Sequence, residues 1–390
     1  DFNFSSCIHC GQCVLVCPTG ALHEKHNITE VQEYLNKQDV VKAIQYSPAV
    51  ASGIAEELGI RNTRDFDKNL NAILRKIGFD RIYSTGAGTD ICVTEIVNCL
   101  IEKEDAGPPE PVYITACPAW VKYAEQFTPS VLPSLSKVKS PQQITGILIK
   151  TLVAGQLGVK PEQIFSVSVS PCIAMKYEAR RDGMMRKGIS DVDSVMTVRE
   201  LARLIRLNGI DVTNIEKEPA DEPLSGRSSS ALLAEVSGGL AESVIRLLYF
   251  RKTGREIDRQ EFRKLRLSGI FRESVFRIEN REIRVAVVDG LNGLEKLRVS
   301  QASGTLYDLV EVMTCQGGCI HGAGLPFVTS KDDLKARTTL VYQADDSEAI
   351  ILPCKSPTLI NLYEKLLKEN REISDKTIFY THFEKRNVLL

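Results

Sequence analysis

Apolar positions follow two different spacings along this chain, and segments with one spacing alternate with segments of the other. Recurrence every three to four residues predicts helices at 28–35, 49–58, 67–77, 141–156, 197–207, 231–249 and 304–313. Short runs rich in Val, Ile and Tyr predict strands at 40–46, 80–84, 112–116, 164–170, 283–288 and 339–343. Strands that alternate with helices indicate an α/β fold with mainly parallel sheets flanked by helices.

Cysteines stand where two of these predicted strands end, each next to a proline. In α/β folds, ligands bind in the crevice beyond the carboxyl ends of the strands. Two further cysteines, four positions apart in a glycine-rich stretch, follow the predicted helix at 304–313. Because thiolates are natural ligands of iron–sulfur centres, four thiols from three segments predict one buried metal site. The four are Cys117, Cys172, Cys315 and Cys319.

Composition and charge narrow the classes of partner. Lys and Arg total 49 and Asp and Glu total 50, which gives a net charge of -1 over 390 residues. This balance argues against nucleic acid or a membrane surface as the main partner. No run approaches the ~18 consecutive apolar residues of a membrane helix. The length suits two or three structural units.

The cysteine count also bears on the compartment. Eleven cysteines are an odd number, so they cannot all pair within the chain. Their clustered spacing favours metal binding in a reducing cytoplasm over structural disulfides. Cys92, Cys99 and Cys354 lie outside the clusters, and we expect them to be buried apolar side chains.

The first residues hold a second metal motif. Cys7, Cys10, Cys13 and Cys17-Pro follow the spacing C-x2-C-x2-C-x3-C-P of bacterial ferredoxins. All four thiolates could hold one [4Fe–4S] cluster, which is the interpretation we favour. The alternative is that Cys17 binds a second cluster whose other ligands precede Asp1, since the fourth cysteine has that role in two-cluster ferredoxins.

Three segments together resemble the signatures of the iron-only ([FeFe]) hydrogenases. Thr115–Trp120 is similar to the first signature, usually TSCCPGW, and Pro171–Arg180 to the second, usually MPCxxKKxEAxR. Glu311–Gly324 resembles the third, usually ExMxCxGGCxxGGGQP. Similar stretches between and after these segments extend the resemblance over nearly the whole chain.

The resemblance implies a fold and a division of the chain. We expect a ferredoxin-like [4Fe–4S] segment at 1–27 and a two-lobed catalytic domain at 28–330. That domain would have mainly parallel twisted sheets flanked by helices around a deeply buried cluster. Residues 331–390 would form a tail that packs on it.

The resemblance also implies a cofactor. The four cysteines would hold the H-cluster, a [4Fe–4S] cubane linked to a two-iron unit with CO, cyanide and azadithiolate ligands. Cys319 would bridge the cubane and the two-iron unit, and Pro48, Gln142 and Met313 would line the pocket of that unit. Electrons would pass through the N-terminal cluster to a ferredoxin-like redox partner or to a signalling protein.

The chain departs from the family along the proton relay. The usual relay cysteine is replaced by Ala116, which has no exchangeable proton, and two relay glutamates are replaced by Ile96 and Cys99. Ser136 alone persists. Glu95 stands one position early, about 100° around a helix from the required side. Positioned acid–base groups contribute about 10²–10⁴-fold in rate, so we expect slow turnover.

Other departures surround the two-iron unit. Met175 replaces a lysine that donates to a cyanide ligand in the family, and Lys176 is expected to point elsewhere. Ser170 replaces a methionine that packs near the two-iron unit. His321 is expected to shape the loop rather than to donate protons. Changes around a metal shift its potential and ligand binding rather than the identity of the metal.

These losses leave the cluster cysteines intact, as in the sensory hydrogenases of the family. We therefore predict an H2-sensing protein that binds and slowly, reversibly oxidises H2 in the cytoplasm. One alternative is an ordinary bidirectional hydrogenase with a rerouted proton path. The other is a non-catalytic iron–sulfur assembly or scaffold relative, which would lack the two-iron unit.

Overall fold

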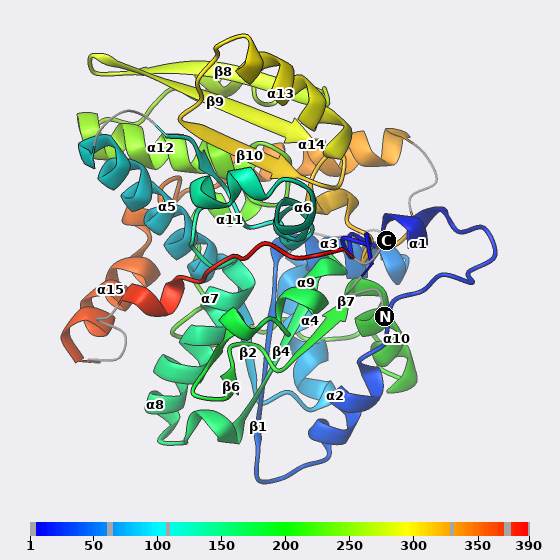
Figure 1. The fold of residues 1–390 in the computed structure, drawn as a ribbon. Coiled ribbons are helices and arrows are strands. Elements are labelled where there is room, and N and C mark those ends of the chain that lie inside the picture. Colours follow the sequence, from blue (N-terminus) through cyan, green and yellow to red (C-terminus); the bar gives the residue numbers. More distant parts are fainter. Residues whose placement is uncertain (1–4, 61–64, 107–109, 328–330, 370–375, 389–390) are drawn as a thin grey trace.

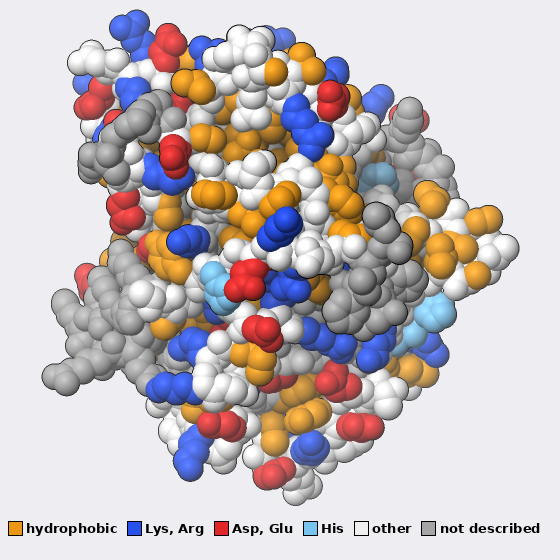
Figure 2. All heavy atoms as spheres, in the orientation of Figure 1, with side chains coloured by type: hydrophobic (Ala, Val, Ile, Leu, Met, Phe, Trp, Pro, Cys, Tyr) orange, Lys and Arg blue, Asp and Glu red, His pale blue; other side chains and the backbone are white. Residues whose placement is uncertain are grey.

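The computed structural model describes residues 5–60, 65–106, 110–327, 331–369 and 376–388. Two four-stranded sheets form two lobes, one above the other in Figure 1. The fold is thus α/β and two-lobed, as the resemblance implied. Basic and acidic side chains lie interspersed over the face shown in Figure 2. No helix of the described part is long and apolar enough to cross a membrane.

The lower sheet is fully parallel, in the order β2-β1-β4-β7. All seven residues of its strand β4 are buried, as expected for a strand covered on both faces. Its strands are β1 (Val41–Tyr46), β2 (Arg81–Ser84), β4 (Ile164–Ser170) and β7 (Ser194–Thr197).

The upper sheet has the order β3-β10-β9-β8, and only β8 runs antiparallel to its neighbour. The exposed and buried residues of β8 alternate, because one face of this edge strand meets solvent. The strands are β3 (Val112–Tyr113), β8 (Phe271–Ile278), β9 (Arg281–Asp289) and β10 (Leu309–Met313). A separate hairpin joins β5 (Met185–Arg186) to β6 (Ile189–Ser190).

One group of helices packs with the lower sheet around a shared apolar core that includes Ile54, Leu70, Val167 and Leu201. The helix that follows β7 begins with a capping box between Thr197 and Glu200. These helices are α2 (Ile28–Leu35), α3 (Pro48–Glu57), α4 (Phe66–Ile77) and α10 (Val198–Leu207).

A second group of helices joins the lobes. Their apolar core contains residues of both sheets, Ala43 of β1 and Val285 of β9 among them. The long helices here are α5 (Gly86–Ala106), α7 (Pro141–Leu148) and α12 (Gly239–Thr253). A π-helical turn, Ile149–Val153, extends α7 into α8 (Ala154–Leu157). The shared core fixes the position of one lobe relative to the other.

The remaining helices complete the fold, and the red segment after the last of them crosses the junction of the lobes in Figure 1. They are α1 (Gln12–Val16), α6 (Pro118–Phe127), α9 (Ala174–Glu178), α11 (Ser230–Leu233), α13 (Leu294–Ala302), α14 (Lys331–Ser347) and α15 (Pro357–Glu369).

Two sequence predictions of secondary structure are wrong, and a third, the helix at 231–249, is interrupted at 234–238 between α11 and α12. The predicted helix at 304–313 ends in strand β10, whose five residues are all buried. A short fully apolar run does not distinguish a buried strand from a buried helix by periodicity. The predicted strand at 339–343 lies inside helix α14. Its β-branched residues favour a strand locally, but the helix around them prevails because tertiary context overrides propensity.

Helix α7 carries Gln142, and its position depends on a close contact at Gly146. A Cβ at Gly146 would lie 2.3 Å from the backbone oxygen of Asp191. We predict that Gly146→Ala lowers the free energy of unfolding by about 1–3 kcal/mol, because the helix must move. Gly155→Ala in α8 is the matched control, since its Cβ meets nothing within 4 Å. It should stabilise the protein by about 0.4–1 kcal/mol. Urea unfolding measures both, and equal effects would contradict the account.

Candidate metal centre

The four predicted cluster cysteines come together at the junction of the lobes. Cys117 precedes α6, Cys172 follows β4, and Cys315 and Cys319 follow β10. Burial raises the pKa of Cys172 well above its usual value, and the thiols of Cys315 and Cys117 raise it further. Burial raises the pKa of Cys315 to about 12, with a further contribution from Cys117. Four thiols thus lie within electrostatic reach of one another.

Glycine makes this convergence possible. Gly318 has φ 95°, and a Cβ there would lie 2.5 Å from the amide nitrogen of Ser237. A Cβ on Gly322 would lie 2.2 Å from the carbonyl oxygen of Pro171, which also accepts a hydrogen bond from the Gly324 amide at 2.8 Å. The glycine-rich loop therefore packs backbone to backbone on the Cys172 turn, closer than any side chain permits.

A cavity of about 60 Å³ adjoins Cys319. Of the three residues predicted to line the two-iron pocket, Gln142 and Met313 line this cavity and Pro48 does not: the neighbouring Ser47 lines it instead, and Pro48 begins α3. The cavity is also lined by Cys319, Ala116, Ser170 and Met175. Ser136, predicted to persist from the proton relay, is buried elsewhere. The Ser136 hydroxyl accepts from the Val138 amide at 3.3 Å.

Lys176 points away from the cavity, as expected from its position. Its Nζ donates to the Lys25 carbonyl at 2.9 Å and to Asn27 Oδ1 at 2.8 Å, and it forms an ion pair with Glu200 at 2.7 Å. Among the described residues, no Lys or Arg lines the cavity beside Met175 in place of the missing lysine. The Ser170 hydroxyl accepts from the Cys172 amide at 3.1 Å, and so orients the cysteine turn.

The positions of the family's relay glutamates offer no carboxyl group. Ile96 is fully buried in the apolar core around α5. The Cys99 Sγ lies 4.0 Å from the Tyr380 hydroxyl. Glu95 accepts hydrogen bonds from Tyr363 and Tyr380, both at 2.9 Å, so its carboxylate is committed to the C-terminal segment. Cys92 is buried, while Cys99 and Cys354 are partly exposed.

Sequence analysis missed one carboxyl group in the cavity. Glu235 lines it together with Cys319, and burial raises the pKa of Glu235 to about 7, although Ser47 and the Ala49 amide lower it. The same carboxyl raises the pKa of Cys319, after the larger effect of burial. A single acid inside the apolar run Ala231–Val236 was the signal in the sequence.

The N-terminal motif lies directly beside the four cysteines. Gln12 Nε2 donates to Cys315 Sγ at 3.1 Å and to the His321 carbonyl at 3.3 Å. Burial raises the pKa of Cys10, which the Cys7, Cys13 and Cys117 thiols raise further. An electron held at the N-terminal motif would therefore reach the four-cysteine site next to Cys315.

Cys17 differs from the other three cysteines of its motif. It follows the last residue of α1, and hydrogen bonds from the Leu22 amide and the Thr19 hydroxyl lower its pKa to about 7. Its Sγ is 3.6 Å from Thr19 Oγ1. That Cys17 binds the same cluster as Cys7, Cys10 and Cys13 stays a prediction.

The donor set fits iron–sulfur clusters. All eleven cysteines are free thiols, and the described residues contain no group of three or more His, Cys, Asp or Glu side chains arranged around a single ion. Sulfur ligands set apart around a common centre suit a multi-atom cubane. The buried Gln142 Oε1 has no hydrogen-bond partner among the described residues, and Gln142 lines the cavity.

Known proteins share both the sequence and the fold. The pattern of the family described as iron only hydrogenase large subunit, C-terminal domain, matches residues 40–323, and that of the 4Fe-4S binding domain matches residues 1–23. The chain therefore belongs to the iron-only hydrogenase family and carries an iron–sulfur binding segment.

Two curated relatives with different names have similar sequence identities to this chain. The NADP-reducing hydrogenase subunit HndD of Solidesulfovibrio fructosivorans is 34% identical over 98% of this chain and 67% of its own length. Protein NAR1 of Arabidopsis thaliana is 30% identical over 98% of this chain and 85% of its own. The solved structure of the [FeFe]-hydrogenase HydA(deltaEFG) has a TM-score of 0.80 at 26% identity, over 93% of this chain and all of that one.

The Gln12–Cys315 hydrogen bond should tune the cubane bound by Cys315. A donor to a ligand sulfur stabilises the reduced, more negative cluster. We predict that Gln12→Leu lowers the cubane reduction potential, measured by a redox titration followed by electron paramagnetic resonance. Gln301→Leu removes a remote donor to the Tyr113 hydroxyl and should leave the potential unchanged. An unchanged potential in Gln12→Leu would contradict the contact.

Proposed function

We propose that this chain binds an H-cluster at Cys117, Cys172, Cys315 and Cys319 and senses H2 by oxidising it slowly and reversibly. The observation that carries the proposal is the cavity beside Cys319. It adjoins the thiol predicted to bridge the cubane and the two-iron unit, while the lining residue at the usual proton relay is Ala116. The site keeps the ligands and lacks the fast proton supply.

When bound, the H-cluster supplies the centre at which H2 is split and its two electrons are taken up. The residues of the chain position and isolate that centre. Gln142 and Met313 shape the cavity, and Ser170 holds the Cys172 turn. Ala116 accepts and donates no proton, and Ile96 keeps water out of the former relay line.

The N-terminal cysteines would hold a [4Fe–4S] cluster, which would supply a path for the electrons. Gln12 joins that segment to Cys315, which favours a short path between the two centres. The receiver in this proposal is a ferredoxin-like redox protein or a separate signalling protein. The free state of all eleven cysteines supports a reducing, cytoplasmic setting.

Two other functions remain candidates. An ordinary bidirectional hydrogenase would need a proton route that avoids Ala116. An iron–sulfur assembly protein is favoured by the similarity to the cytosolic iron-sulfur assembly component 3 of Mus musculus, which is 27% identical over 98% of this chain and 83% of its own length. The cavity argues for a two-iron unit, since a protein that holds only cubanes has no need of a space beside Cys319.

An infrared spectrum distinguishes these functions. CO and cyanide bound to iron absorb where protein does not, so the matured protein should show their bands, and Cys319→Ser should lose them. Absence of the bands in the matured wild-type protein would favour the assembly function. Bands together with turnover as fast as that of standard hydrogenases would favour the ordinary enzyme.

Restoring the relay thiol should speed turnover. We predict that Ala116→Cys raises H2 oxidation at least several-fold, because a positioned proton carrier contributes up to about 10²–10⁴-fold and the rest of the relay is still absent. Ala202→Cys, a buried substitution in α10 away from the cavity, is the control and should change nothing. Gas chromatography measures the rates. No gain in Ala116→Cys would show that proton supply at this position is not limiting.

A further inference from the structure

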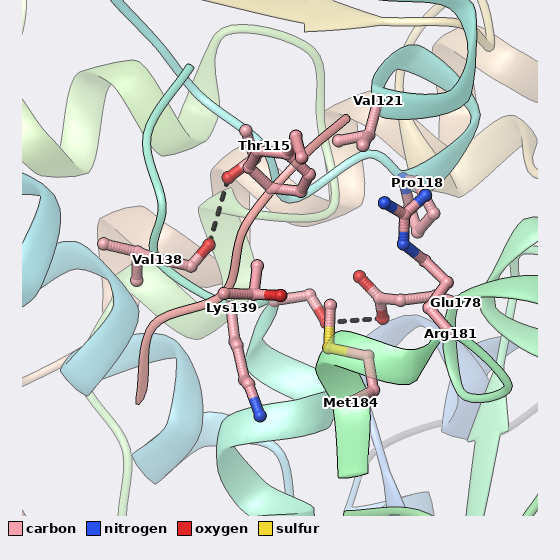
Figure 3. A pocket seen from close by; sticks show the side chains of 11 residues that line it. Thr115, Pro118, Val121, Val138, Lys139, Glu178, Arg181 and Met184 are labelled. Carbon is pink, nitrogen blue, oxygen red and sulfur yellow. Dashed lines mark hydrogen bonds between the residues drawn. The ribbon is translucent and has the colours of Figure 1, made fainter. Parts of the chain in front are cut away.

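A second, smaller cavity lies on the other side of the segment Ser140–Gln142. It has a volume of about 10 Å³, room for about one water molecule. Thr115, Ser140, Glu178, Arg181 and Thr381 are among its lining residues (Figure 3). Pro141 and Gln142 line the cavity beside Cys319, so neighbouring residues of one segment border the two spaces.

Glu178 lines the small cavity and contacts the segment that borders both spaces. Its Oε2 accepts a hydrogen bond from the Ser140 hydroxyl at 2.7 Å, drawn as a dashed line in Figure 3, and one from Gln143 Nε2 at 3.3 Å. Gln142 Nε2 lies 3.4 Å from the same oxygen and 3.4 Å from the Met175 carbonyl. These two long contacts hold the Gln142 amide only weakly.

No cation neutralises the Glu178 carboxylate among the described residues. Lys139 forms an ion pair with Asp191 at 2.5 Å, and Arg181 forms a bidentate pair with Glu125 at 2.9 and 2.6 Å. In Figure 3 the Lys139 ammonium points away from Glu178. Met175 lies three residues earlier on α9, on the same side of the helix. A lysine at 175 would have placed an ammonium near this carboxylate.

The electrostatic surroundings agree with this geometry. Burial raises the pKa of Glu178 to about 7, while Ser140, Gln143, Arg181 and Lys139 lower it by smaller amounts. Glu178 in turn raises the pKa of Cys92 on α5. A buried carboxyl that titrates near neutrality is suited to hold and release a proton.

We propose that Glu178 holds the proton exchanged between the cavity beside Cys319 and solvent, by way of one water molecule in the small cavity. The proposal rests on the function proposed above. A lysine at position 175 would form an ion pair with Glu178 and keep it ionised. The replacement of that lysine by Met175 therefore allows Glu178 to take up a proton.

Each H2 oxidised releases two protons and two electrons, and Glu178 carries the protons one at a time. A water in the larger cavity reaches its Oε2 when the weakly held Gln142 amide swings aside. The proton then passes to the water in the small cavity and on to solvent past Thr381. The electrons leave separately through the cubanes, so Glu178 is neither oxidised nor reduced.

The first test needs no two-iron unit. In protein that carries only its cubanes, infrared titration should show a protonated carboxyl band that disappears near pH 7. Glu178→Gln should remove this band. Met175→Lys should move its loss to lower pH by about one to three units, because a nearby cation favours the charged carboxylate.

The control is Glu311→Gln. Burial also raises the pKa of Glu311 to about 7, but its carboxylate caps α12 through the Gly238 and Ala241 amides at 2.6 and 2.7 Å and lines neither cavity. The Glu311→Gln variant should lose a different carboxyl band and keep the Glu178 band. If Met175→Lys does not fold, Glu178→Asp, which keeps the carboxyl, should retain a titrating band.

The second test uses the matured protein. Glu178→Gln should slow the exchange of H2 with D2O at least tenfold and change its pH profile, while CO and cyanide bands stay. Glu311→Gln should retain the wild-type rate. A wild-type rate and pH profile in Glu178→Gln, with the bands present, would overturn the role of Glu178 alone. Missing bands in the wild-type protein would overturn the function on which it rests.

Discussion

The whole site depends on the backbone contact between the glycine-rich loop and the Cys172 turn. Gly322 and Gly324 pack on the Pro171 carbonyl, and Gly318 packs on the Ser237 amide. No side chain fits in either place, so these contacts constrain the backbone conformation of the loop between Cys315 and Gly324. That contact joins the ends of β4 and β10, which belong to different sheets, and brings their cysteines to one point.

The same packing isolates the site from water and from charge. Lys176 is held by Glu200 at a distance from the cavity, and Met175 occupies the place next to it. Ala116 and Ile96 offer no proton carrier on the side of α5. In such surroundings a buried acid changes its protonation state near neutral pH, and each remaining polar group has a large effect on proton supply. The slow turnover of the proposed function is what such isolation would produce.

Much of the fold and most of the site could be predicted from the sequence. Alternating periodicities indicated parallel α/β layers, and cysteines at strand ends indicated the metal centre. Position on a helix correctly placed Lys176 away from the cavity. The strand β10 was missed because a buried apolar run has no diagnostic period. Glu235 and Glu178 were missed as cavity groups because their meaning depends on which residues from distant segments surround them.

The most direct measurement is the infrared spectrum of the matured protein under H2 and under argon. The account predicts CO and cyanide bands whose positions change reversibly with H2, together with slow H2 oxidation. Such a response requires the H-cluster at Cys117, Cys172, Cys315 and Cys319 and a site that reports H2 more than it consumes it. Absence of the bands, or bands that do not respond to H2, would contradict the account.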